Sequence, residues 1–436
     1  MPISFRPHLS PIWRNRDFRR YWVADAISDL GSSLSYFALP IVAAVTLGVS
    51  PGQMGLMRAL GNVPVVFVGL LAGVWVDRVS RLRLMIGLNF AAAALVASVP
   101  LAYALDALTV EHLYALSLAF GLLWPFWGAA NNAFVPSLVA PDQLVDANSK
   151  LQLTWTVSGI AGPGIGGVLI GLVRAPFLLL IDAASFVVTV IFLAGVRTRV
   201  PEQTGNDAPP GRVRSQIVDG LRATFVDPVQ RAITIPRAIL DLIDSLSTTV
   251  LVLYILRDVR LTASLMGLAF ALSFVGFVAG SLIAPRLERR LEIGGMIVLG
   301  LFLVAASPYT MVIANDSLPD AVNVLFFAIP GFIGGTGGVI QFIGLSSLRQ
   351  TITPERMLGR VWASASVLGA ILAVIGAAVG GILGETLGLR AAIIVAAVGY
   401  ALPFVYIWLS PLRHATRIAA TADRTDEAAA EPESVT

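Results

Sequence analysis

The sequence contains no cysteine, three histidines and a single lysine. The lack of cysteine excludes disulfides, thiolate nucleophiles and cysteine-bound metals. The histidines, at positions 8, 112 and 414, fall at chain ends or in a predicted loop, so we expect no zinc motif or histidine-based triad. The lysine, Lys150, stands in SKLQL rather than in a phosphate-binding loop. We therefore expect no enzyme, no cofactor and no bound metal.

Charge is also scarce. Only 13% of the 436 residues are charged and 56% are hydrophobic, whereas a soluble domain carries about 25% charged residues. Apolar stretches of about 20 residues, long enough to cross a bilayer as helices, recur along almost the whole chain. We predict an all-α integral membrane protein with twelve transmembrane helices, at 18–47, 53–75, 83–105, 112–138, 148–171, 175–196, 231–256, 263–285, 293–314, 321–347, 359–384 and 388–410.

The arginines are spread over alternate loops rather than gathered in one patch, which argues against a nucleic-acid partner. They cluster before the first predicted span and after the second, sixth, eighth and tenth, and the opposite loops hold fewer. By the positive-inside rule both termini are predicted to be cytoplasmic. The use of arginine in place of lysine and the abundance of alanine suggest a GC-rich bacterium, so we expect a multi-pass protein of the cytoplasmic (inner) membrane.

Matching features about 213–215 residues apart indicate an internal repeat. Asp29 and Asp244 are 215 residues apart, and Gly162-Pro-Gly-Ile-Gly-Gly167 is echoed by Gly376-Ala-Ala-Val-Gly-Gly381 at 214. Duplicated halves are typical of secondary transporters. We predict a cytoplasmic segment 1–17, six-helix bundles 18–196 and 231–410, a linker 197–230 containing an amphipathic helix, and a disordered tail 411–436.

The loop after the second span reads AGVWVDRVSRLRLM. Gly73, Asp77, Arg78 and Arg81 stand on the key positions of a pattern that resembles the loop signature of the major facilitator superfamily. The resemblance implies two pseudo-symmetric six-helix bundles and a gating role for these four residues at the cytoplasmic helix ends. Simple positive-inside decoration would explain the arginines but not Asp77.

SGIAGPGIGGVLIG in the fifth span looks like the antiporter motif of the same superfamily. Gly162, Pro163, Gly166 and Gly167 carry the resemblance, which implies export. The alternative is helix packing alone, because small residues let helix backbones approach closely in lipid.

Acidic residues interrupt the first and seventh spans. Asp25, Asp29, Ser32 and Tyr36 recur at helical spacing and form a polar stripe. Acids inside a membrane generally face a bundle interior or a water-filled cavity and mark ion or substrate pathways. Desolvation raises the pKa of a carboxyl and an opened water path lowers it again, so a carboxyl that alternates between such environments can carry protons.

The seventh span carries a similar stripe that includes Asp241 and Asp244. We predict Asp29 and Asp244 as the main proton-coupling residues, with Asp25 and Asp241 in support. Asp241 stands four residues after Arg237, so a simple ion pair along the helix is the alternative. Arg58 and Asp182 form another possible ion pair, and a structural role for Asp182 stays open.

Aromatic and amide side chains on several spans suit a cavity for an amphiphilic compound. The predicted lining residues are Tyr36, Trp124, Trp127, Asn131, Tyr254 and Gln341. Most aromatic residues in membrane proteins serve packing or the interfacial belt, which is the alternative for each.

The resemblance covers nearly the whole chain, and the start, FRRYWVADAISDLGSSLSYFALP, is similar to the branch containing bacterial macrolide and enterobactin exporters. It implies a monomeric, proton-coupled antiporter that exports a lipophilic or amphiphilic small molecule by alternating access. Two alternatives stay open: a symporter or uniporter for a small nutrient, and a transporter-like sensor without flux.

Overall fold

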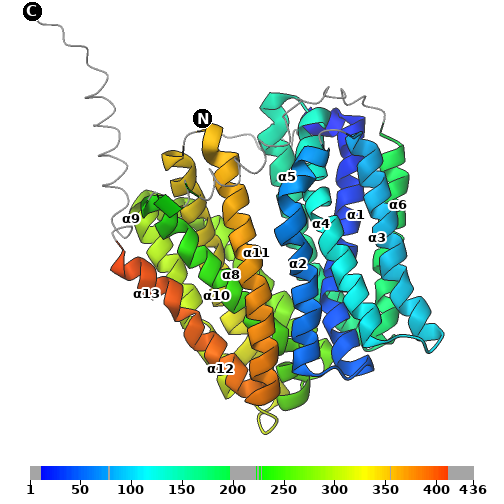
Figure 1. Cartoon of the computed structure of the whole chain (residues 1–436), viewed down its shortest axis with the longest axis vertical. Coiled ribbons are helices and arrows are strands. Elements are labelled where there is room, and N and C mark those ends of the chain that lie inside the picture. Colours follow the sequence, from blue (N-terminus) through cyan, green and yellow to red (C-terminus); the bar gives the residue numbers. More distant parts are fainter. Residues whose placement is uncertain are drawn as a thin grey trace, which may run out of the picture. The chain divides into compact units, whose positions relative to one another are not determined.

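The computed structural model describes residues 11–76, 79–196, 222, 225–226, 228–353 and 355–410, and within these ranges it contains helices and no strands. Figure 1 shows their arrangement. The main helices are α1 (Arg16–Ile41), α2 (Pro51–Val76), α3 (Arg81–Ala104), α4 (Val110–Leu138), α5 (Leu144–Ile170), α6 (Ala175–Ala194), α8 (Pro228–Leu253), α9 (Ala263–Ala306), α10 (Asp320–Ile352), α11 (Glu355–Thr386), α12 (Leu389–Gly399) and α13 (Ala401–Leu409). Short π-helical segments, Val42–Thr46 and Tyr254–Asp258, extend α1 and α8.

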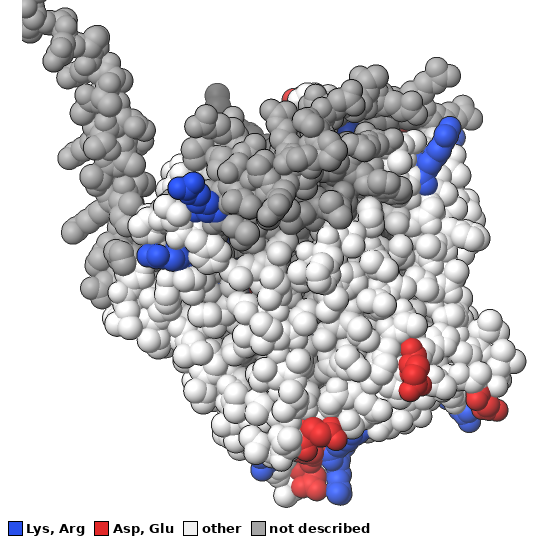
Figure 2. Space-filling view, viewed as in Figure 1, with Lys and Arg blue, Asp and Glu red and all other residues white. Residues whose placement is uncertain are grey.

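Ten helices are long and apolar enough to cross a membrane when only the described residues are searched. Two predicted spans, 263–285 and 293–314, both lie on α9, which turns at Glu292 (φ 60°). The predicted span 53–75 lies on α2, which is not among the ten. The protein is therefore a helical multi-pass membrane protein, and the count of twelve stays a prediction. On the face shown in Figure 2 the visible charged side chains lie at helix ends, with uncharged surface along the helices.

The chain folds into two compact units. Unit 1 is Met1–Gly48 with Phe67–Asp207, and unit 2 is Val49–Val66 with Ala208–Thr436. The first part of α2 thus groups with unit 2, whereas the predicted boundary placed all of residues 18–196 in the first bundle. The predicted segment 1–10, most of the linker 197–230 and the tail 411–436 lie outside the described residues.

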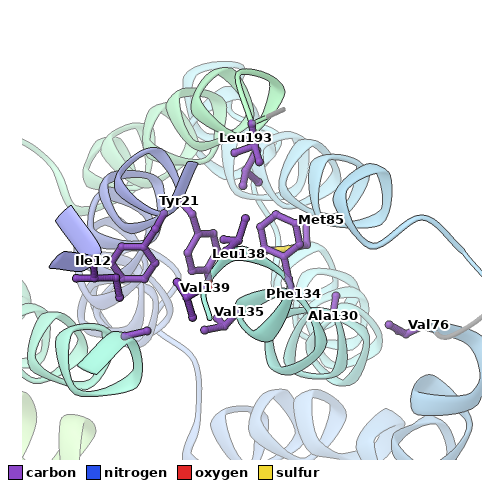
Figure 3. Packing of buried hydrophobic residues seen from close by; sticks show 13 residues of the cluster. Ile12, Tyr21, Val76, Met85, Ala130, Phe134, Val135, Leu138, Val139 and Leu193 are labelled. Atoms are coloured by element: carbon purple, nitrogen blue, oxygen red, sulfur yellow. The ribbon is translucent and has the colours of Figure 1, made fainter. Parts of the chain in front are cut away.

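Unit 1 has an aromatic and aliphatic core between α1, α3, α4 and α6. Tyr21 and Phe134 are buried with ring centroids 5.4 Å apart in an edge-to-face arrangement, which is a preferred geometry for aromatic pairs. Asn15 caps α1 by accepting the backbone N–H groups of Asp17 and Phe18, and its side-chain amide donates to the carbonyl of Leu138 at 2.6 Å. The cap therefore starts α1 and ties it to the end of α4. Figure 3 shows the core residues Ile12, Tyr21, Val76, Met85, Ala130, Phe134, Val135, Leu138, Val139 and Leu193.

The ends of the helices give the register of the internal repeat. α1 and α8 begin at residues 16 and 228, their π-helical ends begin at 42 and 254, and α2 and α9 begin at 51 and 263, so each pair is 212 residues apart. Packing agrees with this register: Gly31 of α1 lies against Ser185 of α6, and Ile243 of α8 lies against Gly399 of α12. The 215-residue match of Asp29 with Asp244 is therefore wrong by three residues. The structural counterpart of Asp29 is Asp241, and that of Asp244 is Ser32.

Candidate functional site

The polar stripe of unit 1 lies on α1. Asp25, Asp29 and Ser32 are each partly exposed, and Tyr36 is 70% exposed. One turn below Asp25, the buried hydroxyl of Tyr21 donates a hydrogen bond to the side-chain oxygen of Asn131 on α4. The stripe thus begins at a hydrogen-bonded contact between two helices.

The two carboxyls of this stripe have no basic partner in the part of the chain that is described. Among those residues, the ion pairs of unit 1 join Arg20 to Asp17 and Lys150 to Asp146. Asp25 and Asp29 instead interact with each other, and Tyr21 lies beside Asp25. Two neighbouring carboxyls without a cation repel one another when both are ionised, so their protonation is coupled to each other and to their access to water.

In unit 2 the acids of α8 have different partners. Asp241 forms an ion pair with Arg237, with Oδ1 and Nη2 2.7 Å apart, so the helix-face pair considered from the sequence is present. Asp244 is exposed and accepts a hydrogen bond of 2.5 Å from the hydroxyl of Tyr400, between α12 and α13. Asp241 therefore carries a local counter-ion, whereas Asp244 is held toward the last helices of the unit.

The corrected register groups the acids in a new way. Asp29 and Asp241 occupy equivalent places, while Ser32 and Asp244 each contact the sixth helix of their own unit. Ser32 contacts Asp182 on α6, at 3.5 Å between Oγ and Oδ1, as Asp244 contacts Tyr400. Asp182 is 1% exposed and its nearest polar groups are hydroxyls. Arg58 belongs to unit 2, so its pairing with Asp182 stays a prediction.

The glycines of the fifth span lie in a close contact between α5 and α1. A Cβ added to Gly162 would overlap Ser33, and one added to Gly166 would lie 2.8 Å from the ring of Phe37. Pro163 and Gly167 are buried in the same helix. The packing role of the motif is therefore present, and its implication for transport direction stays a prediction.

Replacing Gly162 with alanine is expected to lower the melting temperature and the transport rate, because the added methyl group forces α5 away from α1. Overpacking of this kind costs about 1–3 kcal/mol. Gly128→Ala on α4 is the matched control, because an added Cβ there meets no atom within 4 Å. Thermal unfolding of both purified variants checks this, and equal melting temperatures would show that α5 and α1 are not in tight contact.

The predicted cytoplasmic gate is only partly described. Asp77 and Arg78 lie outside the described residues, and Gly73 lies on α2. Arg81 begins α3 and donates from Nη1 to the carbonyl of Ala133 on α4 at 3.0 Å. The arginine thus ties the start of α3 to the end of α4, as a residue that joins helix ends would, and its gating role stays a prediction.

A second helix-end contact, which the sequence did not indicate, lies within unit 2. The carboxylate of Glu385 on α11 accepts the backbone N–H of Gly52 at the start of α2, at 3.0 Å. One turn along, an added Cβ on Gly55 would lie 3.0 Å from the Cα of Gly381. Arg257 donates to the carbonyl of Val49 at 2.9 Å. A carboxylate at a helix N-terminus stabilises it, so α2 starts on a site prepared by α11.

The predicted cavity residues separate into two groups. Trp124 is 63% exposed and packs edge to face on Trp127, with ring centroids 5.9 Å apart. Tyr254 is fully buried, and its hydroxyl donates to the carbonyls of Met311 and Ala314. Gln341 is also buried, with its backbone packed against α9. We therefore assign Tyr254 and Gln341 to helix packing, because neither offers surface to a ligand in this conformation.

Arg349, expected in a cytoplasmic loop, lies inside α10 and is buried. Its guanidinium lies over the ring of Trp362, at 5.0 Å, and donates to Thr234 at 3.3 Å. Sequence reasoning also missed Tyr21, Tyr400 and Glu385. The signal for Arg349 was available, since a helix that continues past the apolar stretch carries its next arginine with it.

Comparison with known proteins supports the sequence resemblance. The sequence model of one family, described as transmembrane secretion effector within the major facilitator group, matches residues 7–433. The enterobactin exporter EntS of Escherichia coli O1:K1 is 25% identical over 392 residues, covering 86% of this chain and 88% of the relative. The multidrug efflux pump Tap of Mycobacterium tuberculosis H37Rv is 26% identical over 413 residues, covering 89% and 91%.

Solved structures share the fold. A bacterial homologue of the iron transporter ferroportin aligns with a TM-score of 0.72 and 19% identity, over 90% of this chain and 98% of the other. The nucleoside transporter NupG aligns with a TM-score of 0.71 and 14% identity, over 90% and 99%. All of these proteins are transporters rather than enzymes.

Proposed function

The chain belongs to the transmembrane secretion effector family of the major facilitator superfamily, and from that premise we propose that it exports a lipophilic or amphiphilic small molecule in exchange for protons. It is a membrane transporter whose bacterial relatives are exporters, which implies the inner membrane. The substrate class, the proton coupling, the cytoplasmic termini and a monomeric state are parts of the proposal.

The observation that carries the proton coupling is the stripe on α1. Asp25 and Asp29 are partly exposed on an apolar helix, and no described lysine or arginine pairs with them. Isolated ionised carboxylates are costly in a membrane. Each carboxyl therefore gains from taking up a proton when its surroundings dry and from releasing it when water returns, which is the behaviour that antiport requires.

The substrate face in this proposal is the exposed aromatic surface of unit 1. Trp124 and Tyr36 present large rings that no protein atoms cover, and Trp127 supports the first of them. Flat rings bind amphiphilic compounds of many shapes through dispersion and the hydrophobic effect. The names of the relatives, an enterobactin exporter and a multidrug pump, support a substrate of this kind.

Transport into everted membrane vesicles tests the proposal. With ethidium, tetracycline and enterobactin as probes, acidifying the lumen is expected to drive uptake of at least one. Uptake driven only by the opposite proton gradient would favour a symporter, and uptake without any gradient would favour a uniporter. Binding of a probe to the purified protein without flux in any gradient would favour a sensor.

The corrected register predicts different effects for the two acids of α8. Asp241→Asn should lower proton-driven uptake more than Asp244→Asn, because Asp241 is the counterpart of Asp29 and Asp244 that of Ser32. Both changes keep the side-chain size, so each is the control for the other. Measured in the same vesicles, a larger loss with Asp244→Asn would restore the assignment made from the sequence.

A further inference from the structure

Asp182 is the most deeply enclosed acid of unit 1 that the proton-coupling proposal does not use. It lies on α6 with 1% of its surface exposed, where α6 packs directly on α1. The approach is close because Gly31 of α1 has no side chain: an added Cβ would lie 2.8 Å from Oδ1 of Asp182 and would overlap Ser185. The carboxyl therefore sits in an interface without bulk water.

Only hydroxyl groups surround this carboxyl. Oγ of Ser185 lies 3.3 Å and Oγ of Ser32 3.5 Å from Oδ1 of Asp182. Ser35 lies beside the same carboxyl, but its buried hydroxyl has no hydrogen-bond partner within ordinary distance. None of the ion pairs among the described residues includes Asp182.

A further unpartnered hydroxyl belongs to the same interface. Ser28 is 1% exposed, and its Oγ has no partner. It follows Ala24 by four residues and precedes Gly31 by three, so all three lie on one face of α1. Ala24 accepts a hydrogen bond from Thr189 of α6, and Gly31 contacts Ser185. Ser28 therefore faces α6 between these contacts.

A buried carboxylate without a cation and a buried hydroxyl without a partner are each unfavourable. Their combination at one place indicates that a positive charge with several oxygen ligands is missing. The spacing of the oxygens agrees: 3.3 and 3.5 Å are longer than the roughly 2.5–2.7 Å of a hydroxyl bonded to a carboxylate. They match neighbouring ligands around Na⁺, which is close in size to Ca²⁺ and binds oxygen at about 2.4 Å.

The charge of the cluster favours a monovalent ion. Asp182 supplies one negative charge, and among the described residues no group of three or more histidines, cysteines or acids could hold a metal. A divalent ion would keep an excess positive charge in an apolar interface. We propose that Asp182, Ser32 and Ser185, with Ser35 and Ser28 beside them, bind a sodium ion between α1 and α6.

Unit 2 provides an internal comparison. The residues equivalent to Ser28 and Gly31 are Leu240 and Ile243, and α12 carries Ala396 and Gly399 where α6 carries Asp182 and Ser185. These side chains offer no oxygen, and Ile243 fills the space against Gly399. The sodium site is therefore specific to unit 1, with one ion per chain, and it does not depend on the proposed proton coupling.

Thermal unfolding of the purified full chain tests the site. In NaCl the melting temperature of the wild type should exceed that in KCl or choline chloride of equal ionic strength by roughly 2–4 °C, because sodium binds only the folded state. Ser185→Ala should reduce this difference and Asp182→Asn should remove it. Asp244→Asn, on the equivalent interface of unit 2, should keep it.

Direct binding of radioactive sodium to the wild type, displaced by LiCl but not by choline chloride, should give one site per chain. This measurement keeps the proposal testable if a variant does not fold. Equal melting temperatures of the wild type in NaCl and KCl, or no saturable sodium binding, would overturn the proposal and leave Asp182 as a protonated carboxyl. An unchanged sodium effect in Asp182→Asn would also overturn it.

Discussion

Asp29→Asn is expected to abolish proton-driven transport while leaving the binding of substrate intact. The amide has the shape of the carboxyl but takes up no proton at physiological pH, so the step that couples proton entry to substrate exit is lost. We expect at least a tenfold fall in uptake of the transported probe into everted vesicles, equivalent to about 1.4 kcal/mol in the limiting barrier. Asp29 is chosen because it lies deeper on α1 than Asp25 and has a structural counterpart in Asp241.

Two further measurements separate coupling from folding. Exchange of labelled for unlabelled probe across the membrane, with no proton gradient, should continue in Asp29→Asn, because exchange needs no proton release. Asp106→Asn is the matched control: Asp106 is exposed in the loop after α3, with φ of 52°, a conformation that asparagine also tolerates. If Asp29→Asn transports as well as Asp106→Asn, the assignment of Asp29 is wrong.

A disulfide between the start of α2 and the end of α11 is expected to stop transport reversibly. A Cβ added to Gly384 would lie 2.8 Å from the Cβ of Pro51, within about 1 Å of the separation in a disulfide. Because α2 is divided between the two compact units, its contact with α11 is where a change of conformation should break packing. Oxidised Pro51→Cys/Gly384→Cys should transport at least about tenfold more slowly than the reduced protein.

The absence of native cysteine makes this experiment clean, since no other thiol can react. Each single cysteine variant under the same oxidant is the control, and reduction of the double variant should restore its rate. Crosslinked protein, identified by its mobility after cleavage between the two positions, that transports at the reduced rate would show that this contact stays closed throughout the cycle.

Hydropathy and helical spacing were enough to predict the all-helical membrane fold and the stripe on α1. Both depend on residues close together in the sequence, where the period of the helix decides which side chains share a face. The register of the repeat was misjudged because Asp29 was matched to Asp244 by residue type. The ends of α1 and α8, which the acids do not mark, place Asp241 there instead.

Contacts between distant residues could not be predicted from the sequence. Tyr21 meets Asn131 across 110 residues, Tyr400 meets Asp244 across 156, and Glu385 meets Gly52 across 333. Nothing in the local pattern around a tyrosine or a glutamate specifies such a partner. The burial of Tyr254, which looks like a cavity residue by composition, likewise depends on how α8 packs against its neighbours.

Proton movement caused by substrate tests the central claim most directly. The full chain is reconstituted into proteoliposomes with an acidic lumen containing a pH-sensitive dye, and ethidium, tetracycline or enterobactin is added outside. We predict that at least one probe accelerates the rise of luminal pH in the wild type and none does so in Asp29→Asn. Entry of a probe with no change in the pH trace of the wild type, or no response to any of the three, would contradict proton-coupled export.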